Sequence, residues 1–218
     1  KKVEKTVKLP DNTDWFMIDG THKFGTKNFV PGNSVYGEQL HNDSRDEYRI
    51  WDPHRSKLAA SLLKGIGSVP FYEGTNILYL GTSTGTTASH ISDIISESGI
   101  LFCVEISQRV SRDFIDNVAS LRSNIITIIA DARDPNSYTS IFKIIDCVYC
   151  DISQPDQTLI AINNCKQFLK RKGTLMLVIK TRSIDVTKSP DQNGFTILNT
   201  VDLFPFDKDH AMVIATFT

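Results

Sequence analysis

The spacing of apolar and polar positions changes near residue 50, and this change divides the chain into two parts. Residues 1 to about 48 show no helical periodicity, which predicts a small antiparallel β domain over 1–48. Within it, the polar stretch 41–46 is interpreted as a connector. The short β-like runs and the turn signals between them are residues 4–9 and 15–18, Asp11-Asn12, Asp19-Gly20 and Pro31-Gly32.

The second part, residues 49–218, alternates between short apolar runs and amphipathic segments. The apolar runs predict strands at residues 77–80, 101–105, 125–130, 147–151 and 174–180. The amphipathic segments predict helices at residues 57–66, 86–96, 107–121, 136–142 and 157–169. Such alternation is typical of an α/β fold with a parallel sheet and helices on both faces. Two further strand-like runs follow at residues 196–203 and 211–217.

The most informative segment is residues 77–90, where a buried strand leads through a turn, Gly81 to Gly85, into a helix. Glycines let a ligand approach the backbone, and the first N–H groups of a helix are free donors. The spacing G-x-x-x-G differs from the G-x-G-x-x-G of dinucleotide sites, so it favours a ligand without pyrophosphate, such as S-adenosylmethionine (SAM). A plain tight connection between strand and helix is the alternative.

Charged residues stand at the predicted carboxyl ends of the strands, where open parallel sheets bind ligands. Glu105 can accept both hydroxyls of a ribose, and Asp131 can accept from an exocyclic amine of adenine. Asp151 and Lys180 end the next two strands. Each acid alone could be a helix N-cap or a loop charge. Their repetition at successive strand ends indicates a nucleoside site.

Composition and charge narrow the function. Of the 218 residues, 40% are hydrophobic and 22% are charged, as in ordinary globular proteins, and no apolar run or signal peptide indicates a membrane. The formal net charge is −1, whereas autonomous nucleic-acid binders are usually basic. If this protein acts on RNA, local patches or partner proteins must therefore supply much of the affinity.

The cysteines contain one possible metal or redox motif. Cys147 and Cys150 have the spacing C-x-x-C. Because they fall in a strand pattern with no second ligand pair, we interpret them, with Cys103 and Cys165, as core residues of an intracellular protein.

Several stretches carry a more specific signal. They are residues 28–38, 48–60, 78–87, 131–133, 151–157, 179–180 and 207–212. In this order they resemble the fibrillarin family, SAM-dependent RNA 2′-O-methyltransferases of box C/D ribonucleoproteins. The blocks Arg-Ser-Lys-Leu and Gln-Pro-Asp-Gln are more specific than the glycine turn. The resemblance implies a class I SAM-dependent methyltransferase (Rossmann-like) fold with a small N-terminal β domain.

The resemblance also implies a cofactor site for SAM. In it the glycine turn holds the cofactor, Glu105 holds the ribose, Asp131 and Ala132 bind adenine, and Asp151 and Gln154 flank the methionine end. The implied cofactor-binding residues are Gly81, Thr82, Ser83, Gly85, Thr86, Thr87, Glu105, Ile106, Asp131, Ala132, Asp151, Ile152, Ser153 and Gln154.

The family's proposed catalytic set falls on Lys57, Asp151, Lys180 and His210. A ribose 2′-hydroxyl is a poor nucleophile near neutral pH, so it needs a base or neighbouring cations. In the implied arrangement Asp151 orients Lys180, and the sequence leaves open which of them takes the proton. Without the resemblance, Lys57 is equally a solvated helix-start residue and His210 a turn residue.

For other polar residues the sequence supports only a less specific interpretation. We interpret His90 as a packing or hydrogen-bonding residue rather than a ligand. One candidate RNA-facing patch comprises Arg45, Arg49, Arg55 and Lys57. A second, which is more typical of a solvated helix C-terminus, comprises Lys166, Lys170, Arg171 and Lys172.

The implied partners are a box C/D guide RNA and target RNA, a Nop5/Nop56/Nop58-type scaffold protein and an L7Ae-type RNA-binding protein, without a membrane. The compartment is the cytoplasm for an archaeal chain, which the motifs favour, and the nucleolus for a eukaryotic one. Two rival functions are a non-catalytic scaffold subunit and an NAD-dependent oxidoreductase, and the absent G-x-G-x-x-G argues against the latter.

Two features depart from the family pattern. The Gly/Arg-rich N-terminal extension of eukaryotic members is absent. Residues 188–194 are too short for the helix expected before the last two strands. We therefore expect a chain break near residues 190–193, with a true deletion as the alternative.

Overall fold

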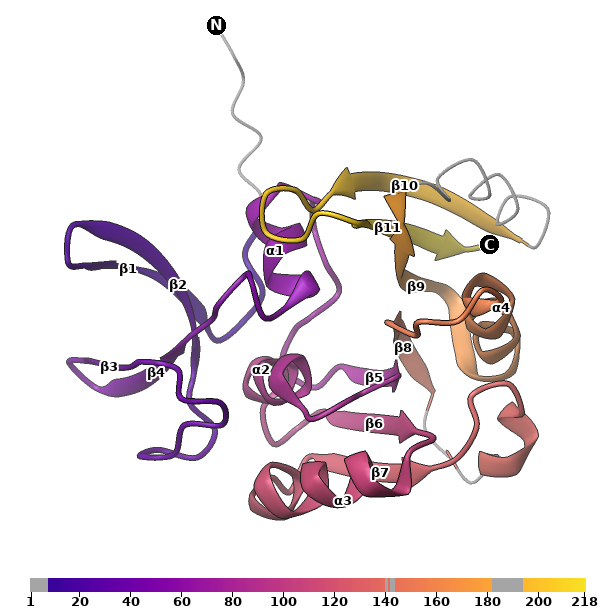
Figure 1. The fold of residues 1–218 in the computed structure, drawn as a ribbon, viewed down its shortest axis with the longest axis horizontal. Coiled ribbons are helices and arrows are strands. Elements are labelled where there is room, and N and C mark those ends of the chain that lie inside the picture. The colour runs from indigo at the N-terminus through magenta and orange to yellow at the C-terminus, as the bar shows by residue number, and fades with distance from the viewer. Residues whose placement is uncertain (1–7, 140, 142–143, 182–193) are drawn as a thin grey trace, which may run out of the picture.

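The computed structural model describes residues 8–139, 141, 144–181 and 194–218. Two sheets dominate this part of the chain (Figure 1). A four-stranded sheet in the order β1-β2-β4-β3 comes first, and a seven-stranded sheet in the order β10-β11-β9-β8-β5-β6-β7 follows.

The first sheet is antiparallel throughout. Its strands are β1 (Thr13–Ile18), β2 (Thr21–Lys27), β3 (Leu40–Asp43) and β4 (Asp46–Ile50). The expectation that residues 41–46 form a connector is wrong, because they belong to the β3–β4 hairpin, with His41 opposite Tyr48. Polar side chains conceal this hairpin in the sequence because β3 buries none of its residues. The run expected at residues 4–9 lies mostly outside the described residues.

The second sheet confirms the predicted α/β class. Its strands are β5 (Asn76–Leu80), β6 (Ile100–Glu105), β7 (Ile125–Ile129), β8 (Ile145–Cys150), β9 (Leu169–Lys180), β10 (Phe195–Asp202) and β11 (His210–Phe217). Strands β5 to β9 are parallel to one another, and β11 lies antiparallel between β9 and β10. The chain break expected near residues 190–193 lies outside the described residues.

Helices cover both faces of this sheet. They are α1 (Lys57–Leu63), α2 (Thr86–Ile95), α3 (Gln108–Asn117) and α4 (Gln157–Phe168), with short 3₁₀ turns η1 (Ala119–Leu121) and η2 (Pro135–Tyr138). Apolar residues of α1, α2 and α3 share one core with the sheet, and those of α4 and η2 share the core on the opposite face. None of the described helices is long and apolar enough to cross a bilayer.

The helix predicted at residues 136–142 is the one clear error among the helices. Among the described residues of this range, the structure has only the turn η2, which begins at Pro135. Proline suits a helix start, but the serine, tyrosine and threonine that follow are weak helix formers. Local propensity therefore does not extend the turn.

Helix α2 is buried on nearly all sides because it lies between the large sheet and the N-terminal sheet. Two of its polar residues, His90 and Asp93, bond to Thr26 of β2. His90 bonds to Thr26 at 2.7 Å and to Tyr36 at 2.8 Å, and its ring stacks on Trp51 with centroids 4.7 Å apart. Burial and the nearby arginine charges hold the pKa of His90 well below its usual range. The packing and hydrogen-bonding role predicted for His90 is confirmed.

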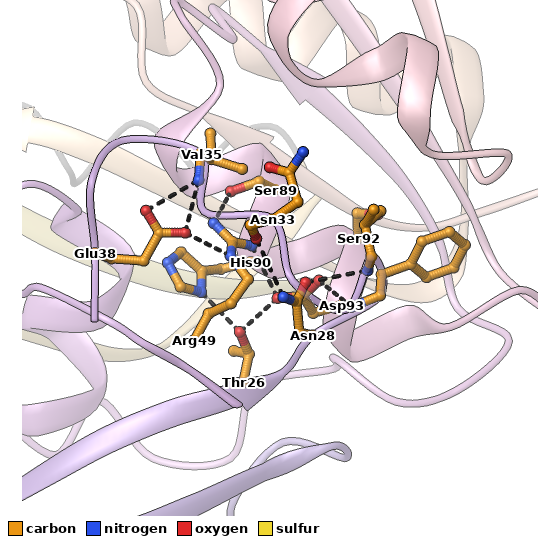
Figure 2. Close-up of polar contacts among 12 residues, drawn as sticks. Thr26, Asn28, Asn33, Val35, Glu38, Arg49, Ser89, His90, Ser92 and Asp93 are labelled. Atoms are coloured by element: carbon orange, nitrogen blue, oxygen red, sulfur yellow. Dashed lines mark hydrogen bonds and ion pairs between the residues drawn. The ribbon is translucent and has the colours of Figure 1, made fainter. Parts of the chain in front are cut away.

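A buried ionic network joins the two sheets through this helix (Figure 2). Arg49 of β4 contacts Glu38 at 2.6 Å and Asp93 of α2 at 2.9 Å, and Arg122 contacts the other oxygen of Asp93 at 2.6 Å. The two arginines and two carboxylates balance in charge. Arg49 is fully buried, so its prediction as an RNA-facing residue is wrong.

Candidate active site

The turn between β5 and α2 brings the backbone close to the end of β8. Gly81 has a φ of +81°, and a Cβ added there would lie 2.5 Å from the backbone oxygen of Asp151. Only glycine combines this conformation with this approach. Gly85 is the N-cap of α2, and no side chain caps this helix. Its first N–H groups therefore remain available to a ligand.

Glu105, at the end of β6, is fixed across this turn. Its Oε2 accepts a hydrogen bond from the Ser83 N–H, and its Oε1 accepts one from the Ser107 N–H, each at 3.0 Å. A carboxylate has about four acceptor positions. Glu105 therefore keeps acceptor capacity for the hydroxyls of a bound sugar.

The predicted cofactor-binding residues gather around two cavities that share Gly81 and Asp151. The first, of about 240 Å³, is lined by Gly81, Ser83, Glu105, Ile106, Asp131, Ala132, Asp151, Ile152, Ser153 and Gln154. The second, of about 490 Å³, is lined by the remaining ones, Thr82, Gly85, Thr86 and Thr87, together with Lys57. The hydroxyl of Thr87 already bonds to Ser56, the N-cap of α1, at 2.9 Å.

Arg133 also belongs to the site, although it is not among the residues predicted from the sequence. Its guanidinium bonds to Gln154 at 3.1 Å, to Asp156 at 3.3 Å and to Asp131 at 3.4 Å. It thereby ties the loop after β7 to the loop after β8 beside the first cavity. The signal in the sequence is an arginine two residues after a strand-end acid, within one of the stretches that resemble the family.

The predicted catalytic residues lie close together, but their pairing differs from the expectation. Asp151 accepts two hydrogen bonds from the Nζ of Lys57, at 3.0 and 3.2 Å, with the side chains 20% and 26% exposed respectively. From the sequence we expected Asp151 to orient Lys180. Among the described residues, no ion pair joins these two side chains. The helix start of α1, capped by Ser56, presents Lys57 to the carboxylate instead.

Lys180 and His210, the other two predicted catalytic residues, lie together beside Asp151. They are register partners on β9 and β11, and with Asp151 they line a cavity of about 450 Å³. The Nδ1 of His210 lies 2.8 Å from Asp207. Burial alone would raise the pKa of Asp207, but the bonds from His210 and from the Asp209 N–H hold it below its usual range. The imidazole is therefore held by an ionised partner.

The remaining predicted groups are not part of this site. All four cysteines are buried in the core, and no group of potential metal ligands is present in the part of the chain that the structure describes. Lys170, Arg171 and Lys172 belong to β9 rather than to a helix end, and Lys170 pairs with Asp146.

Comparisons with known proteins agree with this arrangement. A family model described as Fibrillarin matches residues 10–218. A curated relative from Staphylothermus marinus, named fibrillarin-like rRNA/tRNA 2′-O-methyltransferase, is 48% identical over 212 residues, which cover 92% of this chain and 90% of the relative.

Among solved structures, this chain is similar to fibrillarins. Aeropyrum pernix fibrillarin, in complex with natively bound S-adenosyl-L-methionine, has a TM-score of 0.89 and 41% identity over 96% of this chain and 98% of that chain. The fibrillarin of a fibrillarin/Nop5p complex has a TM-score of 0.79 and 34% identity over 97% of this chain and 100% of that chain.

Proposed function

Because this chain belongs to the fibrillarin family, we propose that it methylates the 2′-hydroxyl of ribose in rRNA and tRNA with SAM as methyl donor. The observation that carries the proposal is that the predicted cofactor site and the predicted catalytic residues line adjacent cavities. The turn at Gly81 and the carboxylate of Glu105 border one cavity, and the Lys57–Asp151 pair lies at the next one, which shares Gly81.

The residues present fit SAM. Gly81 lets the turn pack directly against the backbone of Asp151, which brings the glycine turn and this carboxylate to one place, and Glu105 has the acceptor positions that ribose hydroxyls need. We assign the adenine end to Asp131 and Ala132 and the methionine end to Asp151, Ile152, Ser153 and Gln154. When bound, SAM supplies an electrophilic methyl group. The protein must then prepare the hydroxyl that receives it.

We assign that preparation to the residues around Asp151. The Lys57 ammonium and the Asp151 carboxylate hold one another at the cavity edge, so neither is free to turn away. From this position Lys57 can stabilise negative charge that develops on the ribose oxygen. Lys180 and His210 border the neighbouring cavity, which Asp151 also lines, and they can accept or relay the proton. The carboxylate and Lys180 both remain candidates for the base.

The family relationship also supports a protein assembly. A relative has been solved with Nop5p, and we propose that this chain binds a Nop5-type scaffold protein. We further propose that a box C/D guide RNA and an L7Ae-type protein select the target, in the cytoplasm of an archaeal cell. The formal net charge of −1 supports the proposal that partner molecules supply most of the affinity for RNA, because the chain alone has no excess of cations to attract it.

Calorimetric titration with SAM tests the cofactor assignment, with NAD as the control ligand. We expect saturable SAM binding, no response to NAD, and a Kd raised about tenfold or more by Glu105→Ala, since hydrogen bonds to charged groups contribute ~1.5–3 kcal/mol. Glu97→Ala is the matched control, because Glu97 is an exposed acid just beyond the far end of α2. Binding of NAD alone would contradict the proposal.

A further inference from the structure

The buried hydroxyl of Ser56 joins the starts of two helices that border the candidate active site. Ser56 is the N-cap of α1, where its Oγ accepts a hydrogen bond from the Ala59 N–H at 3.3 Å. The same Oγ lies 2.9 Å from Oγ1 of Thr87, the second residue of α2. Lys57 follows directly as the first residue of α1. The helix that carries Lys57 is thus linked to the helix that follows the glycine turn.

The protons available decide the direction of this link. A hydroxyl has one proton and two lone pairs. One lone pair of Ser56 accepts from Ala59, and its proton needs an acceptor because the residue is only 3% exposed. Among the described residues, Oγ1 of Thr87 is the acceptor within hydrogen-bond distance of that proton. Ser56 therefore donates to Thr87, and Thr87 keeps its own proton.

Tyr79 completes the surroundings of Thr87. Burial raises the pKa of Tyr79 well above its usual range, so the phenol stays protonated, and it shares a hydrogen bond with Thr87. The phenol can donate to the second lone pair of Thr87. Both lone pairs of Thr87 are then occupied by protein donors, and its proton is left for a ligand.

The proton of Thr87 is placed to report the cofactor. Thr87 lines the cavity of about 490 Å³ that Gly81, Lys57 and Asp151 also line. An acceptor atom of SAM bound at the glycine turn can take this proton. Hydrogen bonds in a chain polarise one another, so a hydroxyl that donates to a ligand becomes a better acceptor from its other neighbour. A cofactor that accepts from Thr87 therefore strengthens the bond from Ser56.

The start of α1 depends on such contacts. The helix has seven residues, and a helix of that length is marginal in isolation, so its caps and packing fix where it begins. Lys57 reaches Asp151 through a long side chain, with Nζ 3.0 Å from the carboxylate. A displaced helix start therefore displaces the ammonium group.

We propose that Ser56 is a positioning residue, which holds the Lys57 ammonium against Asp151 once the cofactor has engaged Thr87. The inference rests on the proposed function, in which Lys57 assists methyl transfer. Coupling between binding events is reciprocal. If the cofactor strengthens the bond between Ser56 and Thr87, this bond must also favour cofactor binding, and that effect can be measured without RNA.

Calorimetric titration of the purified chain with SAM tests the link itself. Glycine is nearly as good an N-cap as serine but has no hydroxyl, so Ser56→Gly removes the link and keeps the helix start. We expect it to raise the Kd for SAM about fivefold, the contribution of one ordinary hydrogen bond. It should have no further effect in Thr87→Val, where the link is already absent. An unchanged Kd, or an equal rise in both backgrounds, would overturn the proposal.

Kinetics of the complex assembled with the Nop5-type protein, the L7Ae-type protein and guide RNA test whether Ser56 acts through Lys57. We expect Ser56→Gly to lower kcat about tenfold with an unchanged KM for target RNA, because a small displacement of a reacting group is enough for such a loss. In a Lys57→Met background the same substitution should lower kcat no further. Ser61→Ala removes another buried hydroxyl of α1, bonded to the Leu58 carbonyl, and should leave kcat unchanged.

The outcomes separate the possible failures. If Ser56→Gly behaves like Ser61→Ala, or lowers kcat equally with and without Lys57, Ser56 does not position this lysine. An unsubstituted complex that binds SAM but methylates no RNA would instead contradict the proposed function. The calorimetric comparison would then still decide whether Ser56 and the cofactor are coupled through Thr87.

Discussion

At the scale of single residues, the contact between Lys57 and Asp151 defines the catalytic candidates. It joins residues that are 94 positions apart, the start of α1 and the end of β8. The two hydrogen bonds fix the orientation of the Asp151 carboxylate, and they hold the Lys57 ammonium at the edge of the cavity that both residues line. Neither property follows from one of the two residues alone.

Lys57→Met should therefore lower kcat about a hundredfold or more, the range for loss of a group that assists proton transfer or charge development, with little change in SAM affinity. Single-turnover methylation with a radiolabelled methyl donor measures the loss, and calorimetry measures the affinity. Lys64→Met, at the exposed C-cap of the same helix, is the control. Unchanged kcat in Lys57→Met would remove Lys57 from the mechanism.

The buried thiols give a prediction about pH. Burial raises the pKa of Cys103 to about 12, and it also raises those of Cys147, Cys150 and Cys165. The folded protein therefore holds these protons more tightly than the unfolded chain, whose thiols titrate near ~8.5. The stabilisation is complete below that pH and is lost as pH rises towards the folded pKa values.

We expect the free energy of unfolding to fall by about 1.4 kcal/mol per pH unit for each such thiol once pH exceeds ~9. Urea denaturation at a series of alkaline pH values measures this slope. Ellman's reagent should label the thiols only after unfolding. Fast labelling of the native protein at neutral pH would show that a thiol is accessible and that this explanation is wrong.

At the scale of elements, the β5–α2 turn has the strictest geometry in the site. Gly81→Ala should abolish measurable SAM binding and destabilise the fold by about 1–3 kcal/mol or more, because a left-handed backbone is strained and the Cβ collides with Asp151. Gly32→Ala is a close control, since Gly32 has a φ of +83° but no atom within 4 Å of an added Cβ. It should cost ~1–2 kcal/mol and leave SAM binding intact. Equal effects would show that strain alone is responsible.

Sequence patterns predicted the elements of the large sheet better than those of the small one. Buried parallel strands are almost continuously apolar, so β5, β6, β8 and residues 174–180 of β9 are visible in the sequence. The β3–β4 hairpin is not, because its side chains are polar and half-exposed. Local periodicity also does not predict that α2 is buried on nearly all sides, since the N-terminal sheet that covers it is distant in sequence.

In the candidate site, too, contacts between residues that are distant in sequence could not be predicted from local patterns. The strand-end rule predicted that Glu105, Asp131 and Asp151 would meet, and they line one cavity. It could not predict that Asp151 pairs with Lys57, because the choice of partner depends on where α1 packs. Nor could it identify Arg133, whose contacts arise only when two loops come together.

At the scale of the whole molecule, the buried ionic network attaches the N-terminal sheet to the catalytic domain. Arg49→Met would leave Glu38 and Asp93 with buried charge and one fewer cation, which typically costs ~3–5 kcal/mol. Denaturant unfolding should show a loss of that size. Lys27→Met removes an ion pair that is 46% and 37% exposed on the same sheet, and it should cost less than ~1 kcal/mol. Similar losses in both variants would mean that burial adds nothing to this network.

The order of strands has a consequence for synthesis of the protein on the ribosome. Strand β11 lies inside the sheet, between β9 and β10, although it is made after both. A nascent chain that has emerged only as far as β9 already contains the whole cofactor turn, yet it lacks His210 and exposes the backbone edge of β9. Such an intermediate could bind SAM before it could methylate RNA. Premature termination before β11 would accordingly yield an inactive, aggregation-prone product.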